Sequence, residues 1–134
     1  MAGPTKQEAV VAVLQRAGRV LVVQRGPGAV LSGYWAPLSG RIEPGESQEQ
    51  AVIREVREEV RLEATPLKKV WECETDDGEF LLHWWTAEAG PGEMELDSRE
   101  VSDARWVMPD EFLHLAPTFA GDREFFEHVL PNLR

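Results

Sequence analysis

The segment GRIEPGESQEQAVIREVREEVRL, from Gly40 to Leu62, decides the fold of this chain. A Pro-Gly pair near its start predicts a loop, because both residues favour turns. Ser47 follows, and Gln50 three residues later completes a capping-box pattern, which predicts that a helix begins at Ser47. We expect this helix to continue to about Val60 and to pack against the rest of the domain.

The predicted helix carries an apolar face and an acidic face. The apolar face, which should pack inward, is formed by Ile53, Val56 and Val60. The acidic residues stand at positions i, i+3 and i+4, which puts them on one face: Glu55, Glu58 and Glu59. Like charges at this spacing repel by about a few tenths of a kcal/mol per pair, so a cation should lie nearby. Arg54 and Arg57 could supply part of that positive charge, and a divalent ion could supply more.

Mg²⁺ suits such a carboxylate cluster, because it is a hard cation that takes oxygen ligands and keeps waters and substrate phosphates in its shell. The acidic face lies beside the apolar face, so the cluster is expected at the edge of the core, in a cleft. The alternative is an exposed acidic stripe without a ligand, which is common on soluble helices.

Strands are expected on both sides of the helix, which predicts a mixed β-sheet with helices packed on its faces. Two β-branched runs, Glu8–Gln15 and Val20–Arg25, with Gly18 between them predict a hairpin. The other predicted elements are strands at Tyr34–Ser39, Val70–Glu74, Glu79–Ala87 and Ala104–Val107, a turn at Thr75–Gly78, and helices at Pro109–Leu115 and Asp122–Val129. The whole chain, 1–134, is expected to form a single domain.

Composition narrows the possible partners. The net charge is -10, from 24 acidic and 14 basic residues, and such a surface repels nucleic acid backbones. No apolar run approaches the roughly 18 residues that span a membrane, and the N-terminus does not resemble a signal peptide. Cys73 is the only cysteine, which excludes an internal disulfide and favours a cytoplasmic location.

The segment Gly40–Leu62 resembles the signature of the Nudix hydrolase family. That signature is a Gly, five residues, a Glu, seven residues, and then Arg-Glu-hydrophobic-any-Glu-Glu-any-Gly-hydrophobic. The matching residues are Gly40, Glu46, Arg54, Glu55, Val56, Glu58, Glu59 and Leu62. The preceding GYWAPLSG and the later EVSDARW, Glu100–Trp106, also resemble this family. The resemblance implies an α/β/α sandwich, in the α+β class, with a mixed β-sheet flanked by helices.

One position departs from the signature, because Arg61 stands where the family has glycine. A glycine just after a helix usually provides a left-handed cap, and an arginine in that conformation would cost roughly 1 kcal/mol. We therefore expect a slightly altered helix exit and an intact site, since the side chain at this position supplies no ligand.

The resemblance also implies roles for individual residues. The metal ligands would be Gly40, through its carbonyl, and Glu55, Glu58 and Glu59, and the ion would be Mg²⁺, with Mn²⁺ as a possible substitute. The catalytic residues would be Glu58, Glu59, Arg54 and Glu100, with Arg54 orienting the carboxylates. Glu46 would brace the loop before the helix. Glu59 is our choice for the general base, with Glu100 and then Asp103 as alternatives.

Three further residues are candidates for substrate binding. Arg25 ends a predicted strand beside a glycine-rich loop, where it could donate hydrogen bonds to phosphates, although it could equally be a surface charge. Tyr34 or Trp35 could form a platform for a nucleobase, although aromatic residues more often belong to the core. His83 lies in an apolar strand and is expected to be a hydrogen-bonded core residue.

The implied substrate is a small nucleotide, and the first hypothesis is a nucleoside triphosphate pyrophosphohydrolase of the housecleaning type. The second is a hydrolase of dinucleoside polyphosphates, ADP-ribose or nucleotide sugars. Markers of those subgroups are absent, since Asp77 and Gly78 stand near the position of the ADP-ribose group's proline and Phe80 near that of the dinucleotide group's tyrosine. The third hypothesis is a non-catalytic nucleotide-binding module. Small domains of this kind are often homodimers, and the sequence leaves that open.

Overall fold

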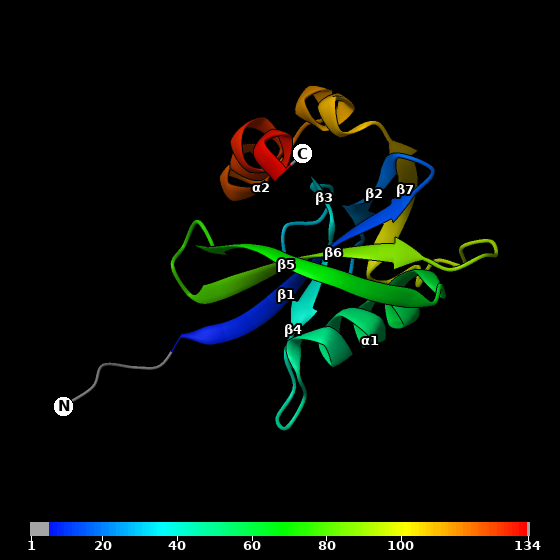
Figure 1. The fold of residues 1–134 in the computed structure, drawn as a ribbon, viewed down its shortest axis with the longest axis horizontal. Helices are drawn as coiled ribbons and strands as arrows, with labels where there is room; N and C mark the ends of the chain where they lie inside the picture. The colour runs from blue at the N-terminus through cyan, green and yellow to red at the C-terminus, as the bar shows by residue number, and fades with distance from the viewer. Residues whose placement is uncertain (1–5, 134) are drawn as a thin grey trace.

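The computed structural model describes residues 6–133, which form one mixed β-sheet covered by helices on both faces (Figure 1). The strands are β1 (Gln7–Arg16), β2 (Arg19–Arg25), β3 (Trp35–Ala36), β4 (Leu38–Arg41), β5 (Ala64–Glu74), β6 (Phe80–Ala89) and β7 (Val101–Val107). The helices are α1 (Gln48–Val60), the 3-10 helix η1 (Pro109–His114), α2 (Ala120–Glu124), the π-helical turn η2 (Phe125–Val129) and the 3-10 turn η3 (Leu130–Leu133). The sequence prediction of a mixed sheet between helices is confirmed.

Strand β1 organises the sheet. It runs parallel to β6 and antiparallel to β2 and β4, within the order β3-β2-β1-β6-β5, and β7 pairs with the other edge of β2. The predicted β1–β2 hairpin closes through Ala17 and Gly18, whose φ angles of 51° and 78° match the positive values that tight hairpin turns need. This arrangement brings β4, and with it Gly40, alongside the start of β1.

The segment 34–39 differs from its prediction as a single strand. It forms two short strands, β3 and β4, on either side of Pro37. Proline has no N–H to donate to a ladder, so a strand is interrupted there. β3 pairs with β2, whereas β4 pairs with β1. The chain is thereby redirected so that β4 lies beside α1.

Several boundaries also differ from the predicted ones. β5 begins at Ala64, well before Val70, and its pairing with β6 is shifted by irregularities between Pro66 and Lys68 and between Lys69 and Trp71. Bulges of this kind break the alternation of apolar and polar residues by which a strand is recognised. The predicted C-terminal helix continues from α2 through the π-helical turn to Leu133.

The two faces of the sheet hold separate cores. One lies beneath α1 and includes Val10, Leu14, Leu38, Val52, Val56 and Val60. The other lies beneath the C-terminal helices and is aromatic, with Trp84, Phe112, Phe125 and Phe126.

Val52 rather than Ile53 is the fully buried residue of the helix face, because Val52, Val56 and Val60 repeat at i+4 and Ile53 stands at the edge of that stripe. His83 is buried, and its Nε2 lies 2.8 Å from Glu8 Oε1, which confirms its prediction as a hydrogen-bonded core residue.

The expectation of an altered exit from α1 is wrong. Arg61 adopts the left-handed conformation that glycine would supply, with φ 60° and ψ 31°, and its N–H donates to the Arg57 carbonyl at 3.0 Å. The next residue, Leu62, is 2% exposed and belongs to the core. Burying a leucine stabilises by about 1.5–3 kcal/mol, which exceeds the roughly 1 kcal/mol cost of the strained arginine.

Arg61→Gly is therefore expected to stabilise the protein by about 0.5–1 kcal/mol, because it removes the left-handed penalty while the cap stays in place. Equilibrium denaturation in urea measures the gain. Arg61→Ala is the matched control, since it removes the same side chain and keeps the penalty. Equal stabilisation by both variants would show that the arginine side chain, and not the backbone, is responsible.

Candidate active site

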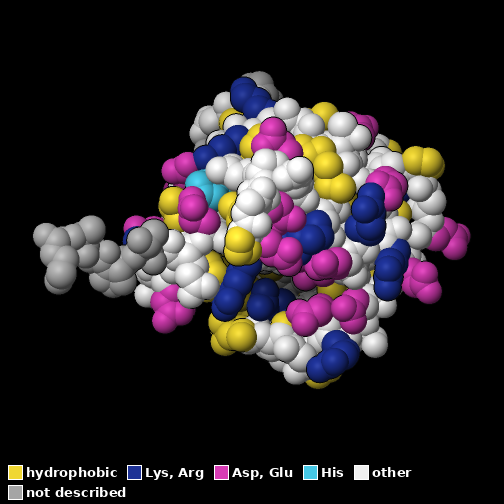
Figure 2. All heavy atoms as spheres, turned by 90° about the horizontal axis from the view of Figure 1, so that it is seen from below, with side chains coloured by type: hydrophobic (Ala, Val, Ile, Leu, Met, Phe, Trp, Pro, Cys, Tyr) yellow, Lys and Arg dark blue, Asp and Glu magenta, His cyan; other side chains and the backbone are white. Residues whose placement is uncertain are grey.

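A cleft of about 980 Å³ opens on the molecule and collects residues from many elements. It is lined by parts of β1, β4, α1, the β5–β6 turn, the loop after β2 and the start of α2. In the space-filling view, acidic and basic side chains gather around a hollow on one face (Figure 2). The volume falls within the range of about 300–1,000 Å³ that is usual for small-molecule sites.

Arg54 is the electrostatic centre of one end of the cleft. Its Nε and Nη2 donate to the two carboxylate oxygens of Glu46 at 2.8 and 2.9 Å, and its Nη1 donates to Glu55 at 2.8 Å and to Glu58 at 3.2 Å. Nη2 also donates to the Arg41 carbonyl at 2.8 Å. These bonds fix the middle of α1 to the loop before the helix and to the end of β4.

Glu46 braces the loop before α1, as the sequence predicts. Besides its two bonds from Arg54, its Oε1 accepts a hydrogen bond from the Glu43 N–H at 3.1 Å. The hydrogen bonds from Arg54 hold the pKa of Glu46 below its usual value, with burial acting in the opposite direction. Glu46 is thus an anion that positions Arg54.

Arg57 does not take part in this network, although its sequence position suggested it. Its guanidinium pairs with Glu63 at 2.8 Å, and both side chains are largely exposed. Arg54 is therefore the arginine of α1 that offsets the acidic cluster.

Gly40 is held against Glu55. A Cβ atom at Gly40 would lie 2.0 Å from the Glu55 Cδ and 2.1 Å from its Oε1, closer than any real contact. The Glu55 side chain is 12% exposed and sits in a place that only glycine leaves open. Burial raises the pKa of Glu55, while the hydrogen bond from Arg54 opposes that shift.

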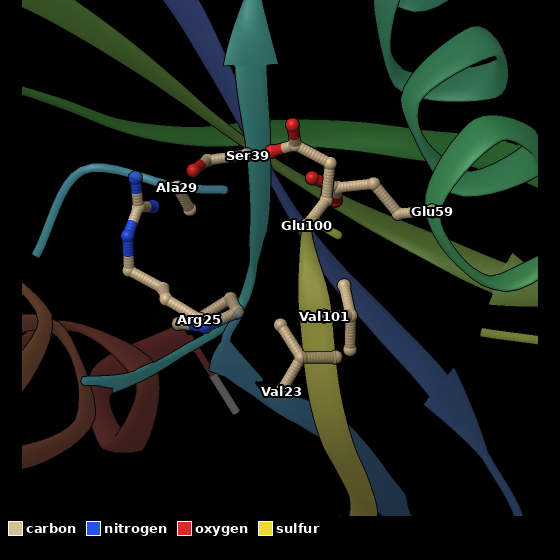
Figure 3. Close-up of a pocket in the computed structure, with 8 residues that line it drawn as sticks. Val23, Arg25, Ala29, Ser39, Glu59, Glu100 and Val101 are labelled. Atoms are coloured by element: carbon tan, nitrogen blue, oxygen red, sulfur yellow. The ribbon is translucent and has the colours of Figure 1, made fainter. Parts of the chain in front are cut away.

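Glu59 is the least compensated acid of the cluster. Its Oε2 is buried and has no hydrogen-bond partner among the described residues. Burial, together with the neighbouring charges of Glu55 and Glu100, raises the pKa of Glu59 to about 9, and Arg25 only partly opposes this. Figure 3 shows Glu59 extending from α1 toward Glu100 at the start of β7, with Arg25 on the opposite side of the hollow.

These residues fit a hard divalent cation. A buried, unpartnered carboxylate oxygen among other acids is costly unless a positive charge meets it, and oxygen ligands are those that Mg²⁺ or Mn²⁺ takes. Glu55, Glu58, Glu59 and the Gly40 carbonyl all border this part of the cleft. Between residues 6 and 133, no three acidic, histidine or cysteine side chains are grouped closely enough to hold a cation, because Arg54 keeps Glu55 and Glu58 in ion pairs.

The structure brings most of the predicted site residues together. Those that line the cleft are Arg25, Gly40, Arg54, Glu55, Glu58, Glu59 and Glu100. Asp103 does not line it, because it lies farther along β7, where its carboxylate accepts from the Ala104 N–H at 2.8 Å and faces Arg105 at 3.6 Å.

The two aromatic candidates lie elsewhere. Trp35 is 6% exposed in the aromatic core, and the Arg105 guanidinium covers its ring at 4.6 Å from the centroid. Tyr34 is half-buried and packs on Phe119 at a centroid distance of 4.8 Å, and it does not line the cleft. Pairing of β3 with β2 directs Trp35 inward, whereas Tyr34 contacts Phe119, which lines the cleft. The role of either residue as a nucleobase platform stays a prediction.

Residues that sequence reasoning missed complete the cleft: Phe80, Phe119, Asp122 and Arg41, whose guanidinium lies 5.4 Å from the Phe80 ring centroid. Arg41 was detectable as a cation next to Gly40. Phe119 and Asp122 carry no local signal, since they reach the cleft only through the packing of the C-terminal helices.

The chain is similar in sequence to several known hydrolases. The sequence model of the NUDIX domain family matches residues 5–129. A CTP pyrophosphohydrolase of Escherichia coli K12 is 36% identical over 114 residues, which cover 82% of this chain and 83% of that protein. An NAD-capped RNA hydrolase, NudC, of Pseudomonas putida W619 is 38% identical over 119 residues, which cover 88% of this chain and 41% of that protein. The chain thus spans well under half the length of that second relative.

Solved structures share the fold. The solution structure of the E. coli ORF135 protein has a TM-score of 0.75 at 28% identity, covering 98% of this chain and 96% of that one. A MutT protein from Methanosarcina mazei Go1 has a TM-score of 0.83 at 21% identity, covering 100% and 99%. Among the helices described between residues 6 and 133, none is long and apolar enough to cross a membrane.

Proposed function

The chain belongs to the Nudix family of pyrophosphohydrolases, and from this membership we propose that it hydrolyses nucleoside triphosphates to a nucleoside monophosphate and pyrophosphate with Mg²⁺ or Mn²⁺. The observation that carries this proposal is that one cleft joins two chemically different ends. One end holds Glu55, Glu58 and Glu59, which suit a cation with phosphates. The aromatic rings of Phe80 and Phe119, with the Arg41 and Arg25 guanidinium groups over them, border the rest of the cleft and suit a base.

The roles of the residues follow from their surroundings. A bound divalent cation would polarise the phosphate chain and offset its charge. Gly40, Glu55, Glu58 and Glu59 would hold that cation. Arg54 would keep the carboxylates in position through its bonds to Glu46, and Arg25 would donate to a phosphate oxygen.

In the proposed reaction, a water oxygen attacks a phosphorus atom, the bond from that phosphorus to the bridging oxygen breaks, and pyrophosphate leaves. Glu59 is our choice to accept the proton of the water, because its Oε2 has no hydrogen-bond partner among residues 6–133. Since its pKa is raised to about 9 in the metal-free protein, a bound cation would have to favour its ionised form for it to act as the base. Glu100, whose charge raises the pKa of Glu59, is the alternative base. Asp103 is set aside, because it lies outside the cleft.

The relatives support a triphosphate substrate over the second candidate. That second candidate is a nucleoside diphosphate linked to a further group, as in NAD, dinucleoside polyphosphates, ADP-ribose and nucleotide sugars. The CTP pyrophosphohydrolase aligns with this chain over most of both lengths, whereas the chain spans 41% of the NAD-capped RNA hydrolase. The β5–β6 side of the cleft is also acidic, with Glu74, Asp76, Asp77 and Glu79, which disfavours a long polyanion such as capped RNA.

A product assay tests the proposal. The four ribonucleoside triphosphates, NAD, ADP-ribose, a dinucleoside tetraphosphate and a nucleotide sugar are incubated with enzyme and Mg²⁺ or Mn²⁺, and the products are separated by ion exchange. We expect monophosphate and pyrophosphate from a triphosphate at the highest kcat/KM. Glu58→Gln should lower turnover by about a hundredfold or more, whereas the exposed Glu49→Gln on the same helix should not.

Other results would redirect the assignment. Release of a diphosphate and orthophosphate would place the cleavage at a different bond. Faster hydrolysis of a dinucleotide would favour the second candidate. Tight nucleotide binding without turnover under either metal would favour the non-catalytic module.

A further inference from the structure

The turn Asp97–Glu100, directly before β7, joins the backbones of two acids of the candidate active site. The Asp97 N–H donates to the carbonyl of Glu59, in the last turn of α1, at 3.0 Å. Because the last carbonyls of a helix have no partner within the helix, this bond completes the end of α1. The Asp97 carbonyl in turn accepts from the N–H groups of Glu100 at 3.0 Å and Val101 at 2.8 Å. The position of Glu59 relative to Glu100 therefore depends on one residue between them.

The same turn also supports the loop that follows Arg25. The Gly26 N–H donates to the Glu100 carbonyl and the Gly28 N–H to the Arg99 carbonyl, both at 2.8 Å. A Cβ atom at Gly26 would lie 2.7 Å from the Arg99 carbonyl oxygen, and one at Gly28 would lie 2.9 Å from it. Both glycines have ordinary φ angles, so this close approach, and not an unusual backbone conformation, is what requires glycine here.

The side chain of Asp97 holds the turn closed. Its Oδ1 accepts a hydrogen bond from the Arg99 N–H at 3.2 Å, so the side chain fixes the backbone two residues further on. The side chain is also partly buried and lines the cleft. An asparagine could accept the same bond through its side-chain oxygen, whereas an alanine could not.

The three residues that meet at this turn face one small hollow. Arg25, Glu59 and Glu100 come from β2, α1 and the turn before β7, and their side chains border a cavity of about 60 Å³ (Figure 3). A cavity of this size has room for only a few water molecules. Because a misplacement of about 1 Å can lower a reaction rate by about a hundredfold, the separation of these groups matters for any reaction at this place.

We propose that the Asp97–Glu100 turn is a positioning element, which holds Glu59, Glu100 and Arg25 in the arrangement that the reaction needs. Asp97 and Gly26 are its positioning residues, because one joins the two acids and the other lets the loop after Arg25 rest on the turn. This inference rests on the proposed function, from which it takes the roles of the three positioned residues. It goes further by assigning roles to two residues outside the cation-binding cluster.

Replacing Asp97 tests the link between the two acids. Asp97→Ala removes the bond from the Arg99 N–H and should lower kcat by about tenfold or more, with a much smaller change in KM, because the phosphate contact of Arg25 remains. The affinity of the nucleotide-free protein for Mn²⁺, measured by calorimetry, should also fall by about tenfold, since Glu59 is a proposed ligand. Asp97→Asn should restore both quantities, because it retains the side-chain acceptor and removes only the charge.

Replacing Gly26 tests the link to the loop. Gly26→Ala places a methyl group against the Arg99 backbone, so it should move the loop and raise KM by about tenfold through the phosphate contact of Arg25. Gly18→Ala is the matched control, because Gly18 has a φ of 78° and no atom within 4 Å of an added Cβ. It should cost about 1 kcal/mol of stability and leave kcat, KM and Mn²⁺ affinity unchanged.

Asp110→Ala controls for the loss of a negative charge, since Asp110 is exposed and lies outside the cleft. It should behave as wild type. Thermal unfolding of every variant establishes that it is folded at the temperature of the assay. If Asp97→Asn is as impaired as Asp97→Ala, the carboxylate acts through its charge, and the positioning role is overturned.

The positioning role and the proposed reaction fail separately. If triphosphates are hydrolysed and Asp97→Ala keeps the wild-type kcat and Mn²⁺ affinity, the positioning role is overturned and the proposed reaction stands. If no triphosphate is hydrolysed while Mn²⁺ affinity falls in Asp97→Ala and returns in Asp97→Asn, the proposed reaction fails and the positioning role stands.

Discussion

Glu59→Gln is expected to lower kcat by about a hundredfold or more and, at the same time, to stabilise the metal-free protein. Glutamine keeps the shape of the side chain and cannot accept a proton from water. It also removes an ionisable group whose Oε2 is buried without a partner in the described part of the chain. Loss of activity with a gain in stability is the signature of a group that is kept for function at a cost in folding free energy.

The pH dependence gives the sign of the stability effect. The pKa of Glu59 is raised to about 9 in the folded protein, from a value near 4.5 in the unfolded chain. Between these values the unfolded state ionises more readily, so the wild-type free energy of unfolding falls as the pH rises from about 5 toward 9. Near pH 8 the glutamine variant should be more stable by on the order of 2 kcal/mol, and below about pH 4.5 the two proteins should be equal.

Thermal unfolding in chelator at several pH values measures this difference. Glu58→Gln is the matched control, because the Glu58 side chain is 57% exposed and paired with Arg54, so its replacement should not stabilise the protein. Equal melting temperatures of wild type and Glu59→Gln near pH 8 would contradict the cost of burial. Near-normal turnover of Glu59→Gln would instead move the role of the base to Glu100.

The start of α1 could be predicted from the sequence because its determinants are local. The Ser47 hydroxyl accepts from the Gln50 N–H at 3.1 Å, and the Gln50 side chain accepts from the Ser47 N–H at 2.8 Å, so four consecutive residues are sufficient to define it. The acidic cluster follows from helical spacing for the same reason. Arg61 shows the limit of this reasoning, since the demand to bury Leu62 outweighs the local preference of an arginine.

The part of the cleft that contains Phe80, Phe119 and Asp122 could not be predicted in that way. Trp35 becomes a core residue because β3 pairs with β2 and bridges to Thr118, a contact between distant parts of the chain. Asp122 is buried because the β5–β6 turn and the end of β2 converge on α2. Neither relation leaves a periodic or spaced pattern, so the sequence alone identifies the acidic cluster and not the rest of the cleft.

Replacing Arg54 by methionine is the second change with a large expected effect. Its guanidinium contacts Glu46, Glu55 and Glu58, and the Glu46 and Glu55 side chains are only 13% and 12% exposed. Removing the arginine leaves shielded acids without a cation, which should destabilise the metal-free protein by about 3 kcal/mol. Because Glu55 and Glu58 would no longer be held in place, kcat/KM should also fall by about a hundredfold.

Three companion variants separate the causes of this loss. Arg57→Met removes an equally long cationic side chain from the same helix, but its partner Glu63 is exposed, so we expect no measurable loss of stability or activity. Arg54→Lys retains the charge and loses the paired bonds to Glu46, so it should recover part of the stability and little of the activity.

Adding Glu46→Gln to Arg54→Met should restore some stability, because it removes one of the carboxylates that Arg54→Met leaves unpaired. If the double variant is less stable than Arg54→Met, Glu46 stabilises the protein through its bond from the Glu43 N–H. If Arg54→Met is as stable as the wild type, the acidic cluster does not need the positive charge of Arg54.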